Sequence, residues 1–290
     1  MPKSVTPFIK WVGGKRQLLE TISNKYPDKV SKYCEPFVGG GCVMFDVINK
    51  LHPDEIMIND INSELINTYT QIKTNVDEMI ESLIEFENLY NNSDDKQGLY
   101  LNKRSEFNMF KFGSDYSPPY RASIFIFLNK TCFNGLYRVN SSGSFNVPFG
   151  KHIKISFNTD NILNVNKALQ NVNITCGDYR NCSKFIDKDT FVYIDPPYRP
   201  LNSTSAFNSY DNSGFNDNDQ IQLSEFIHRI SDIGAKFLLS NSDPTNTNPD
   251  DLFFDNIYYN YNIERVNARR LINSVSSGRG YIRELLISNY

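Results

Sequence analysis

The chain has 290 residues, 40% hydrophobic residues and a formal net charge of −3. This is the composition of a soluble globular protein that forms either one domain with an insertion or two domains. No apolar run is long enough to cross a bilayer and the first residues lack the apolar core of a signal peptide, so we expect a cytoplasmic protein without a membrane partner. The five cysteines form no C-x-x-C pair, and they predict neither a disulfide framework nor a metal site.

The charges are distributed unevenly along the chain. No Asp or Glu occurs in residues 1–19 or from Tyr116 to Thr159, whereas lysines and arginines occur in both stretches. Acidic residues are frequent instead from Asp77 to Asp95, where they are typical of a solvated helical face. A basic surface on an acidic protein is compatible with binding to nucleic acid despite the negative net charge.

Residues 8–16 are expected to form a loop that leads into a helix at 17–24. Lys10 and Lys15 could reach a phosphate, and Trp11 offers a stacking face. Taken alone, a Trp in the core beside two solvated lysines explains this loop better.

A glycine turn follows. A short strand precedes Glu-Pro-Phe-Val-Gly-Gly-Gly, and an apolar helix is expected from Cys42 to Asn49. Such a turn lets a ligand approach the backbone closely, although it is not G-x-G-x-x-G. The next strand, 56–60, ends in Asp60, about twenty residues after the turn, which is the spacing of a carboxylate that binds a ribose. A cofactor carrying adenosine is indicated, and a dinucleotide oxidoreductase is one alternative.

From residue 61 to about 128 the pattern is helical, with no alternating strands. We predict that residues 62–157 are an inserted, mainly helical domain that interrupts a catalytic domain formed by residues 1–61 and 158–290. Residues 133–150 are expected to form a β-hairpin or extended loop. Its Asn, Arg and aromatic residues suit the reading and wedging of bases, and plain turn chemistry explains them equally well. The helices of the insert are expected at 64–73, 76–89, 98–107 and 122–128.

Helices and strands alternate from residue 160 onward, which predicts an open α/β sheet. A helix capped by Asn216 is expected to run to Ile233. The arginines at 265, 269, 270 and 279 are expected in a basic loop between the last two strands. The other elements are expected at 160–169, 172–175, 191–194, 236–240, 257–263 and 282–288.

The most informative stretch is Phe-Val-Tyr-Ile-Asp-Pro-Pro-Tyr, residues 191–198. Its apolar half is typical of a buried strand, and the two prolines end that strand. Asp195 therefore lies at the carboxyl end of a strand, where open α/β sheets bind ligands. The carboxylate, the Pro196 carbonyl and the Tyr198 ring suit a planar base with an exocyclic amino group. A proline turn capped by Asp195 is an equally good interpretation of these residues alone.

In this order, Trp-Val-Gly-Gly-Lys, Glu-Pro-Phe-Val-Gly-Gly-Gly, Ile-Asn-Asp and Asp-Pro-Pro-Tyr resemble the Dam family of DNA adenine-N6 methyltransferases. The chain is most similar to the GATC-modifying methylases that accompany type II restriction endonucleases, with specific signatures at 134–140 and 145–150. The resemblance covers nearly the whole chain. It implies a Rossmann-like sheet that binds S-adenosylmethionine and yields S-adenosylhomocysteine, with the insert as a target-recognition domain.

The resemblance also implies roles for individual residues. The catalytic stretch is Asp195, Pro196, Pro197 and Tyr198. The positions that match cofactor contacts are Trp11, Lys15, Phe37, Gly39, Gly41, Asp60, Asp178 and Asp195. The positions that match contacts to duplex DNA are Lys10, Phe133 as an aromatic wedge, Asn134, Leu136, Arg138, Asn140 and Pro148. Lys151-His152 departs from the arginine–tyrosine pair common in relatives, which puts a contact there in doubt.

The implied reaction is methyl transfer to N6 of an adenine in double-stranded DNA, within GATC. The adenine must first leave the base stack, at a cost of roughly a few kcal/mol. Acceptance of the N6 hydrogens by Asp195 and the Pro196 carbonyl frees the nitrogen lone pair for in-line attack on the methyl group, without a covalent intermediate.

Other functions stay open at this point. No Pro-Cys pair is present, which argues against cytosine-C5 methylation, whereas cytosine-N4 methylation is compatible with these residues. The alternatives are an RNA or protein-glutamine methyltransferase and a non-catalytic DNA-binding module. We expect a monomer or weak dimer that forms no stable complex with a paired restriction endonuclease.

Overall fold

The computed structural model describes residues 4–109, 117–199, 215–269 and 281–290. The chain forms two compact units. Unit 1 comprises residues 1–14, 39–49 and 60–177, and unit 2 comprises residues 15–38, 50–59 and 178–290. Among the described residues, no helix is both long and apolar enough to cross a membrane.

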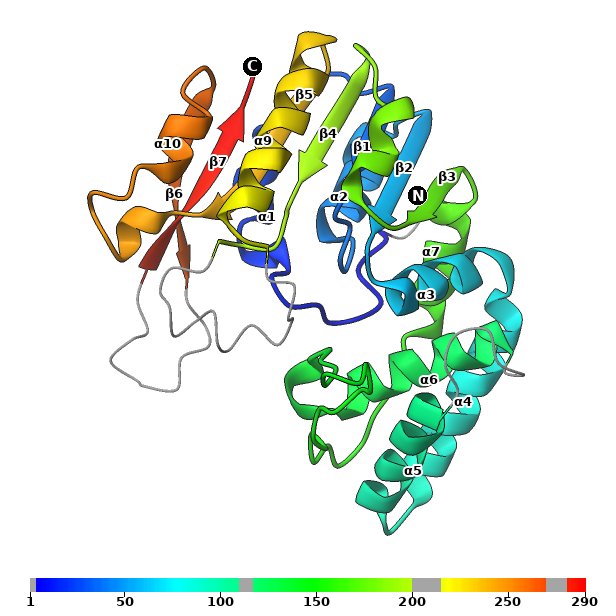
Figure 1. Cartoon of the computed structure of the whole chain (residues 1–290). Coiled ribbons are helices and arrows are strands. Elements are labelled where there is room, and N and C mark those ends of the chain that lie inside the picture. The colour runs from blue at the N-terminus through cyan, green and yellow to red at the C-terminus, as the bar shows by residue number, and fades with distance from the viewer. Residues whose placement is uncertain (1–3, 110–116, 200–214, 270–280) are drawn as a thin grey trace. The chain divides into compact units, whose positions relative to one another are not determined.

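Within the described residues, seven strands form one mixed sheet, which confirms the predicted α/β class with a Rossmann-like arrangement (Figure 1). The strands are β1 (Lys32–Glu35), β2 (Glu55–Asp60), β3 (Val172–Cys176), β4 (Thr190–Ile194), β5 (Lys236–Ser242), β6 (Asn262–Arg269) and β7 (Tyr281–Ser288). Their order is β3-β2-β1-β4-β5-β7-β6. β1 pairs in parallel with β2 and β4, and β4 pairs in parallel with β5. β7 pairs antiparallel with both β5 and β6.

Strand β4 is buried on both faces. Val192 and Ile194 lie in a core that includes Phe226 of helix α9 (Asp217–Asp232), which covers one face in Figure 1. On the opposite face the Phe191 ring lies 5.8 Å from the ring centroid of Tyr33. Because successive strand residues point to opposite faces, a strand covered on both sides is apolar throughout. Both packings fix the end of β4, and therefore the position of Asp195.

The expected helix start at Asn216 is confirmed. The Asn216 side chain accepts the N–H of Asp219, and the Asp219 carboxylate accepts the N–H of Asn216. This reciprocal capping box satisfies amide groups that have no partner within the helix. The shorter helices of unit 2 are η1 (Lys15–Gln17), α1 (Leu19–Ser23), η3 (Tyr179–Lys184), η4 (Pro244–Asn246) and α10 (Phe253–Ile257).

The strand expected at residues 257–263 is wrong. Helix α10 ends at Ile257, a turn follows, and β6 begins only at Asn262. The aromatic and β-branched residues of this run are typical of strands. Tyr258 is instead buried against Phe254 of α10, with the two rings stacked 6.4 Å apart, so tertiary packing overrides the local preference.

The basic loop expected after this strand is also wrong where the structure describes it. Arg265 lies on β6, where its guanidinium bonds Asp255 at 2.8 Å. Arg269 is the last residue of that strand. Arg270 and Arg279 lie outside the described residues.

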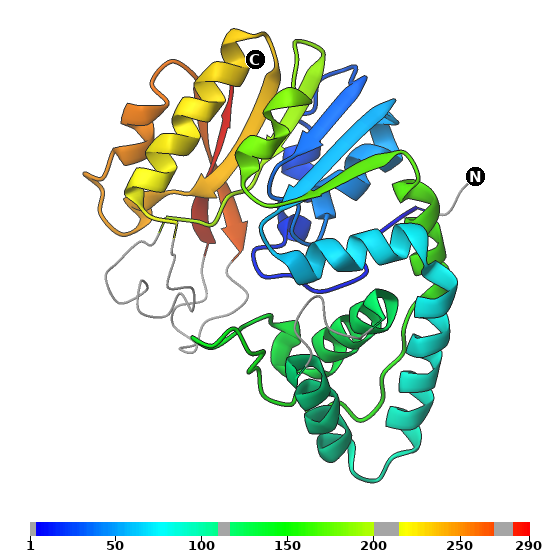
Figure 2. The same ribbon diagram turned by 45° about the vertical axis from the view of Figure 1, so that its right-hand side comes forward.

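Unit 1 is mainly helical. Its helix α6 packs against α3, α4 and α5 (Figure 2). Most residues of α6 are buried. The buried Arg121 of α6 donates three hydrogen bonds to Glu64 of α3, which compensates the charge that α6 carries into the core. The helices are α2 (Cys42–Leu51), α3 (Ser63–Thr74), α4 (Val76–Asn92), α5 (Lys96–Met109), α6 (Pro118–Thr131), η2 (Phe133–Gly135) and α7 (Thr159–Leu169).

Candidate functional site

Asp195 directly follows β4, and one of its carboxylate oxygens is held by two donors. Oδ1 accepts a hydrogen bond from the Lys15 ammonium at 2.7 Å and another from the Ser240 hydroxyl at 2.9 Å. Ser240 lies on β5, and its hydroxyl also lies 3.0 Å from the Tyr193 hydroxyl. Among the described residues no donor reaches Oδ2. The carboxylate is thus oriented through one oxygen while the other can accept a ligand hydrogen.

Burial controls the charge of this carboxylate. Removal from water raises the pKa of Asp195 above its ordinary value, and the Lys15 ammonium and the Ser240 hydroxyl oppose that rise. Only 6% of the Lys15 side chain is exposed, so the charge of the ammonium acts with little screening. Desolvation is the larger of the two effects, and it makes Asp195 a more basic acceptor than an exposed carboxylate.

The proline turn after Asp195 is held by side chains from other elements. Gln220 of α9 donates to the Pro197 carbonyl at 3.1 Å. The Tyr198 hydroxyl donates to Glu284 of β7 at 2.6 Å, and the Lys15 ammonium lies 4.5 Å from the centroid of the Tyr198 ring. Among the described residues no donor reaches the Pro196 carbonyl. The turn therefore holds a fixed ring and a carbonyl acceptor next to Asp195.

In unit 1, Asp60 organises the glycine turn. Its Oδ2 accepts the N–H of Gly39 at 3.0 Å, and its Oδ1 accepts the N–H of Asn62 at 2.9 Å. Burial raises the pKa of Asp60 from its ordinary value, and these amide hydrogen bonds oppose the rise. A half-buried carboxylate beside a glycine turn can accept hydrogen bonds from a pair of sugar hydroxyls.

Glycine is required in this turn for steric reasons. Gly39 has a φ of 48°, and a Cβ there would lie 2.9 Å from Cδ1 of Trp11. Gly41 has a φ of 72°, and a Cβ there would lie 2.5 Å from the Tyr69 hydroxyl, which donates to the Gly39 carbonyl at 3.1 Å. Trp11 also stacks on Tyr137, with ring centroids 5.7 Å apart. Trp11, Gly39, Gly41 and Asp60 are therefore brought together in unit 1.

Two of the expected cofactor residues have other contacts in unit 2. The Phe37 ring packs on Tyr179 at 5.4 Å and on Phe215. Asp178 caps η3 through the N–H of Arg180, and both of its carboxylate oxygens accept hydrogen bonds from the Arg180 guanidinium. That guanidinium lowers the pKa of Asp178. Asp178 is thus committed to a neighbour two residues away.

The expected recognition loop folds back on itself. Val139 and Phe145 form an isolated antiparallel bridge, so the hairpin has no longer ladder. The Asn140 side-chain oxygen accepts the N–H groups of Ser142 and Ser144, and it therefore shapes the tip. Arg138 donates to the side-chain oxygen of Asn146 at 2.6 Å and to its carbonyl at 3.1 Å, which fixes one edge of the guanidinium.

The start of this loop is also rigid. The Phe133 N–H donates to the carbonyl of Pro148 at 2.9 Å, while 51% of Phe133 remains exposed. Asn134 has a φ of 56°, in the left-handed region that Asn tolerates. Pro148 is exposed and Leu136 is half-buried. An exposed aromatic ring on a fixed backbone is suited to insertion between bases.

Several contacts of the site were not predicted from the sequence. Ser240 and Glu284 hold Asp195 and Tyr198, Asn146 holds Arg138, and Tyr69 holds Gly39. Ser240 did carry a signal. Ser240 is the last residue of one predicted strand, and Asp195 directly follows another. Since neighbouring parallel strands bring their carboxyl ends together, these two residues could be expected to lie close to each other.

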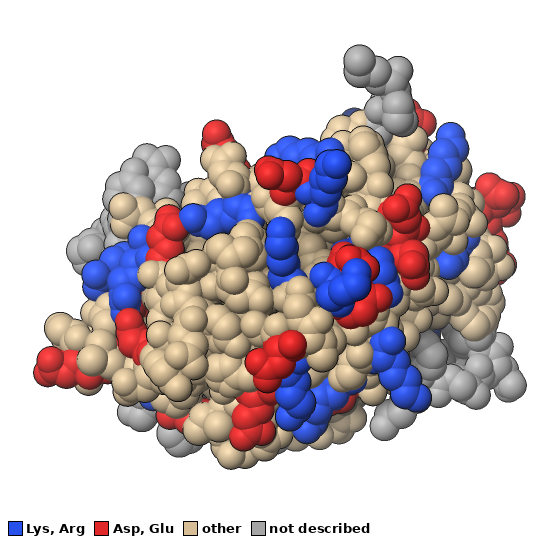
Figure 3. Space-filling model, turned by 90° about the horizontal axis from the view of Figure 1, so that it is seen from above, with Lys and Arg blue, Asp and Glu red and all other residues tan. Residues whose placement is uncertain are grey.

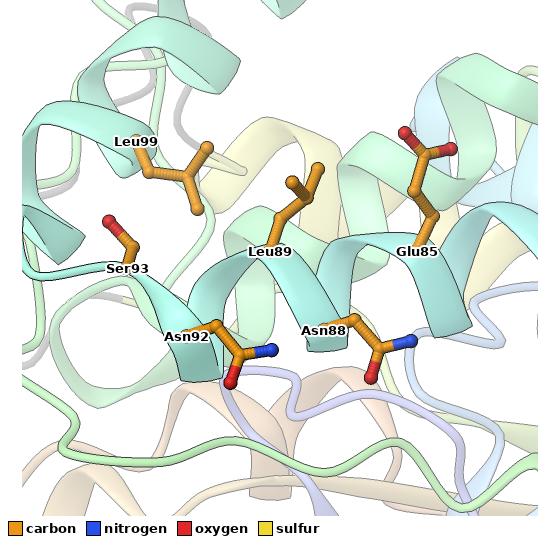
Figure 4. A pocket seen from close by; sticks show the side chains of 6 residues that line it. All are labelled: Glu85, Asn88, Leu89, Asn92, Ser93 and Leu99. Carbon is orange, nitrogen blue, oxygen red and sulfur yellow. The ribbon is translucent and has the colours of Figure 1, made fainter.

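The remaining surface offers less chemistry. A hollow is lined mainly by one face of α4, at the helical spacing of Glu85, Asn88, Leu89 and Asn92 (Figure 4). Glu85 is the one ionisable group among the described residues that line it. On the face in Figure 3, lysines and arginines are interspersed with acidic residues. Neither feature is as strong a candidate for the functional site as the cluster around Asp195 or the cluster around Asp60.

Comparison with known proteins gives consistent matches. The model of D12 class N6 adenine-specific DNA methyltransferases matches residues 11–272. The chain is 44% identical to type II methyltransferase M.MjaIII of Methanocaldococcus jannaschii, over 99% of each chain. It is 37% identical to type II methyltransferase M1.LlaDCHI of Lactococcus lactis, over 99% of this chain and 96% of that one. It is 32% identical to a DNA adenine methylase of Vibrio cholerae, over 98% and 96%.

Proposed function

This chain belongs to the D12 class of N6 adenine-specific DNA methyltransferases, and we propose that it transfers the methyl group of S-adenosylmethionine to adenine in GATC. The enzyme class rests on the family match along nearly the whole chain. GATC is proposed from the signatures at residues 134–140 and 145–150. The substrate is double-stranded DNA, and the cofactor product is S-adenosylhomocysteine.

One observation carries the assignment of Asp195. Its Oδ1 is fixed by Lys15 and Ser240, whereas its Oδ2 and the Pro196 carbonyl have no donor among the described residues. An adenine amino group has two hydrogens, which match these two acceptors. Donation of both hydrogens withdraws the nitrogen lone pair from ring conjugation and leaves it available to attack the methyl group. Asp195 and Pro196 are therefore the acceptors, and Tyr198 is the stacking surface for the flipped base.

Tyr198 also lowers the cost of base flipping. Stacking of a base on an aromatic side chain contributes about 1–3 kcal/mol, comparable with the cost of extruding the base. The hydroxyl bond to Glu284 holds the ring in one orientation before the base arrives. The ring therefore loses little conformational freedom when the base stacks.

The cofactor is assigned to the glycine-turn cluster. Asp60 binds the ribose hydroxyls of S-adenosylmethionine, while Trp11, Gly39 and Gly41 form the surface that the cofactor approaches. Lys15 and Phe37 complete this set by sequence match. Asp178 is assigned near the adenine of the cofactor on the same ground, and this role requires its bond to Arg180 to rearrange or to be shared.

DNA recognition is assigned to residues 62–157 together with Lys10, and catalysis to residues 1–61 and 158–290. The loop residues Phe133, Asn134, Leu136, Arg138, Asn140 and Pro148 contact the duplex, with Phe133 as the wedge. The absence of Asp and Glu from Tyr116 to Thr159 keeps this stretch free of repulsion by phosphates. The enzyme is placed in the cytoplasm with its DNA, acts without a stable complex with an endonuclease, and is a monomer or weak dimer.

The test is sequencing of modified bases in DNA from a methylation-deficient host that expresses the chain. N6-methyladenine confined to GATC is the expected result. N6-methyladenine in another sequence would refute only the assignment of GATC. N4-methylcytosine would refute adenine as the target base. Asp195→Ala and Asp195→Asn provide the matched test of the acceptor. Both are expected to abolish transfer while the protein stays folded, with a lower unfolding temperature because the buried Lys15 ammonium loses this carboxylate. Near-normal turnover in either would refute the role of Asp195.

Transfer of radiolabelled methyl groups separates the other substrates. Purified enzyme is incubated with duplex DNA, single-stranded DNA, RNA and protein. Label in RNA or protein that exceeds label in duplex DNA would overturn the proposal. No label in any substrate, with DNA still bound, would favour a non-catalytic DNA-binding module.

A further inference from the structure

The N-terminal segment of unit 1 is held by asparagine side chains instead of strand pairing. Each of three asparagines accepts the N–H of one residue and donates to the carbonyl of the same residue. Asn49 brackets Val5 in this way, Asn161 brackets Thr6 and Asn129 brackets Lys10. A carboxamide bears one acceptor and two donor hydrogens, so each bracket imitates the pairing of a neighbouring strand.

Asn129 differs from the other two brackets. Its side-chain oxygen accepts the Lys10 N–H at 3.0 Å, and its Nδ2 donates to the Lys10 carbonyl at 2.8 Å. The same Nδ2 donates to the Gly135 carbonyl at 2.9 Å. Both amide hydrogens are thereby used, and the residue is only 6% exposed near the end of α6. Because this side chain is buried and both of its amide hydrogens are bonded, it affects a ligand only by positioning the residues that it contacts.

Gly135 of the loop packs tightly against Lys10. Gly135 has a φ of 66°, and a Cβ there would lie 2.8 Å from Cβ and 2.7 Å from Cδ of Lys10. The Lys10 side chain thus lies directly on the Gly135 backbone. Gly135 in turn belongs to η2 with Phe133 and Asn134. One buried amide therefore fixes the backbone of Lys10 relative to the start of the recognition loop.

We propose that Asn129 is a specificity-positioning residue, which holds Lys10 and the 133–136 turn in one register so that both meet the same DNA site. The inference rests on the proposed function, because it takes Lys10 and this turn as DNA contacts. Base reading by hydrogen bonds is sensitive to small displacements. Loss of the bracket therefore weakens discrimination between sequences more than it weakens methyl transfer itself.

The measurement is the ratio of methylation rates on GATC and on each single-base variant, in short duplexes with saturating S-adenosylmethionine. Asn129→Ala is expected to lower this ratio about tenfold, the size of one weakened base contact. Asn161→Ala is the matched control, because it removes the same kind of bracket from Thr6 without touching the loop. It is expected to lower the thermal unfolding temperature and leave the ratio unchanged.

A double-mutant cycle tests whether the effect of Asn129 on specificity depends on Lys10. In a Lys10→Ala background, Asn129→Ala is expected to lower the ratio less than it does alone, because part of its effect passes through Lys10. Gly135→Ala disturbs the same contact from the loop side, and it decides the question if Asn129→Ala does not fold. Its ratio is also expected to fall.

The inference is overturned if Asn129→Ala lowers all rates by one common factor, if Asn161→Ala lowers the ratio as much, or if Gly135→Ala leaves it unchanged. Wild-type enzyme that does not prefer GATC would instead contradict the proposed function. In that case the same ratio is measured on the sequence that it does prefer, and the role of Asn129 is judged there.

Discussion

The buried Lys15 and the half-buried Asp195 form an ion pair in unit 2, with 2.7 Å between Nζ and Oδ1. Lys15 begins η1 near the start of the chain, and Asp195 follows β4 in its second half. The same ammonium lies 4.5 Å from the centroid of the Tyr198 ring. One cation therefore contacts both the proposed acceptor and the proposed stacking surface, and it opposes the rise in the pKa of Asp195 that burial causes.

Replacement of Lys15 by Met is expected to shift the acid limb of the pH profile upward. The reaction needs the ionised carboxylate, and burial already raises the pKa of Asp195 while Lys15 opposes that rise. Without the ammonium the pKa rises further, so kcat/KM falls to half its maximum at a higher pH. Lys15→Arg keeps a positive charge and is expected to shift the limb less. The pH dependence of kcat/KM measures both, and an unmoved acid limb in Lys15→Met would contradict the assignment.

Removal of the Ser240 hydroxyl is expected to lower kcat without weakening cofactor binding. Ser240→Ala deletes one of the two donors that orient Asp195 and leaves the Tyr193 hydroxyl without this partner. A hydrogen bond to a charged group contributes about 1.5–3 kcal/mol, which corresponds to roughly a 10- to 100-fold fall in kcat.

Single-turnover kinetics and cofactor calorimetry provide the comparison for Ser240. The matched control is Ser224→Ala, which removes a buried hydroxyl whose one hydrogen bond among the described residues is to the carbonyl of Ile221. It is expected to leave kcat unchanged. An equal fall in both variants would indicate a general loss of stability.

The sequence contained most of the local information about the fold. The apolar run of β4, the prolines after it and the Asn216 cap are short-range signals, and each predicted its element correctly. The strand expected at 257–263 was wrong because the burial of Tyr258 against Phe254, a tertiary effect, decided the local structure. Local preference is reliable where packing agrees with it.

The partners of the site residues were less predictable. Glu284 reaches Tyr198 because β7 lies antiparallel beside β5, a pairing that no local pattern of the sequence fixes. Asn129 lies near the end of an apolar helix, and its residue type alone gives no indication of three backbone hydrogen bonds. Sequence motifs predict the acceptor itself. The side chains that orient it can be identified only from tertiary contacts.

Replacement of Asp60 by Ala is expected to weaken S-adenosylmethionine binding by about 10- to 100-fold, the effect of losing hydrogen bonds to a charged group. Affinity for DNA without cofactor is expected to change little. The unfolding temperature also falls, because Asp60 holds the N–H groups of Gly39 and Asn62. Calorimetry with cofactor and a DNA-binding titration distinguish the two affinities. Unchanged cofactor affinity would refute the placement of the ribose at this carboxylate.

Arg138 is expected to read one base pair. Asn146 orients the guanidinium of Arg138. A guanidinium can donate two parallel hydrogen bonds to the paired acceptors of guanine in the major groove. Arg138→Ala is expected to cost about 1–3 kcal/mol and to relax recognition at a single position of GATC. Arg138→Lys keeps the charge but not the fork, so it is expected to relax the same position.

Lys151→Ala is the control for Arg138. It removes an exposed cation outside the hairpin, and if that lysine meets a phosphate it weakens all sequences alike and reduces the salt dependence. Methylation of GATC and each single-base variant is measured for all three variants at two salt concentrations. Uniform loss in Arg138→Ala together with full activity in Arg138→Lys would make Arg138 a phosphate contact. Base reading would then rest on the expected DNA contacts of unit 1 that precede Arg138 in the chain, which are Lys10, Asn134 and Leu136.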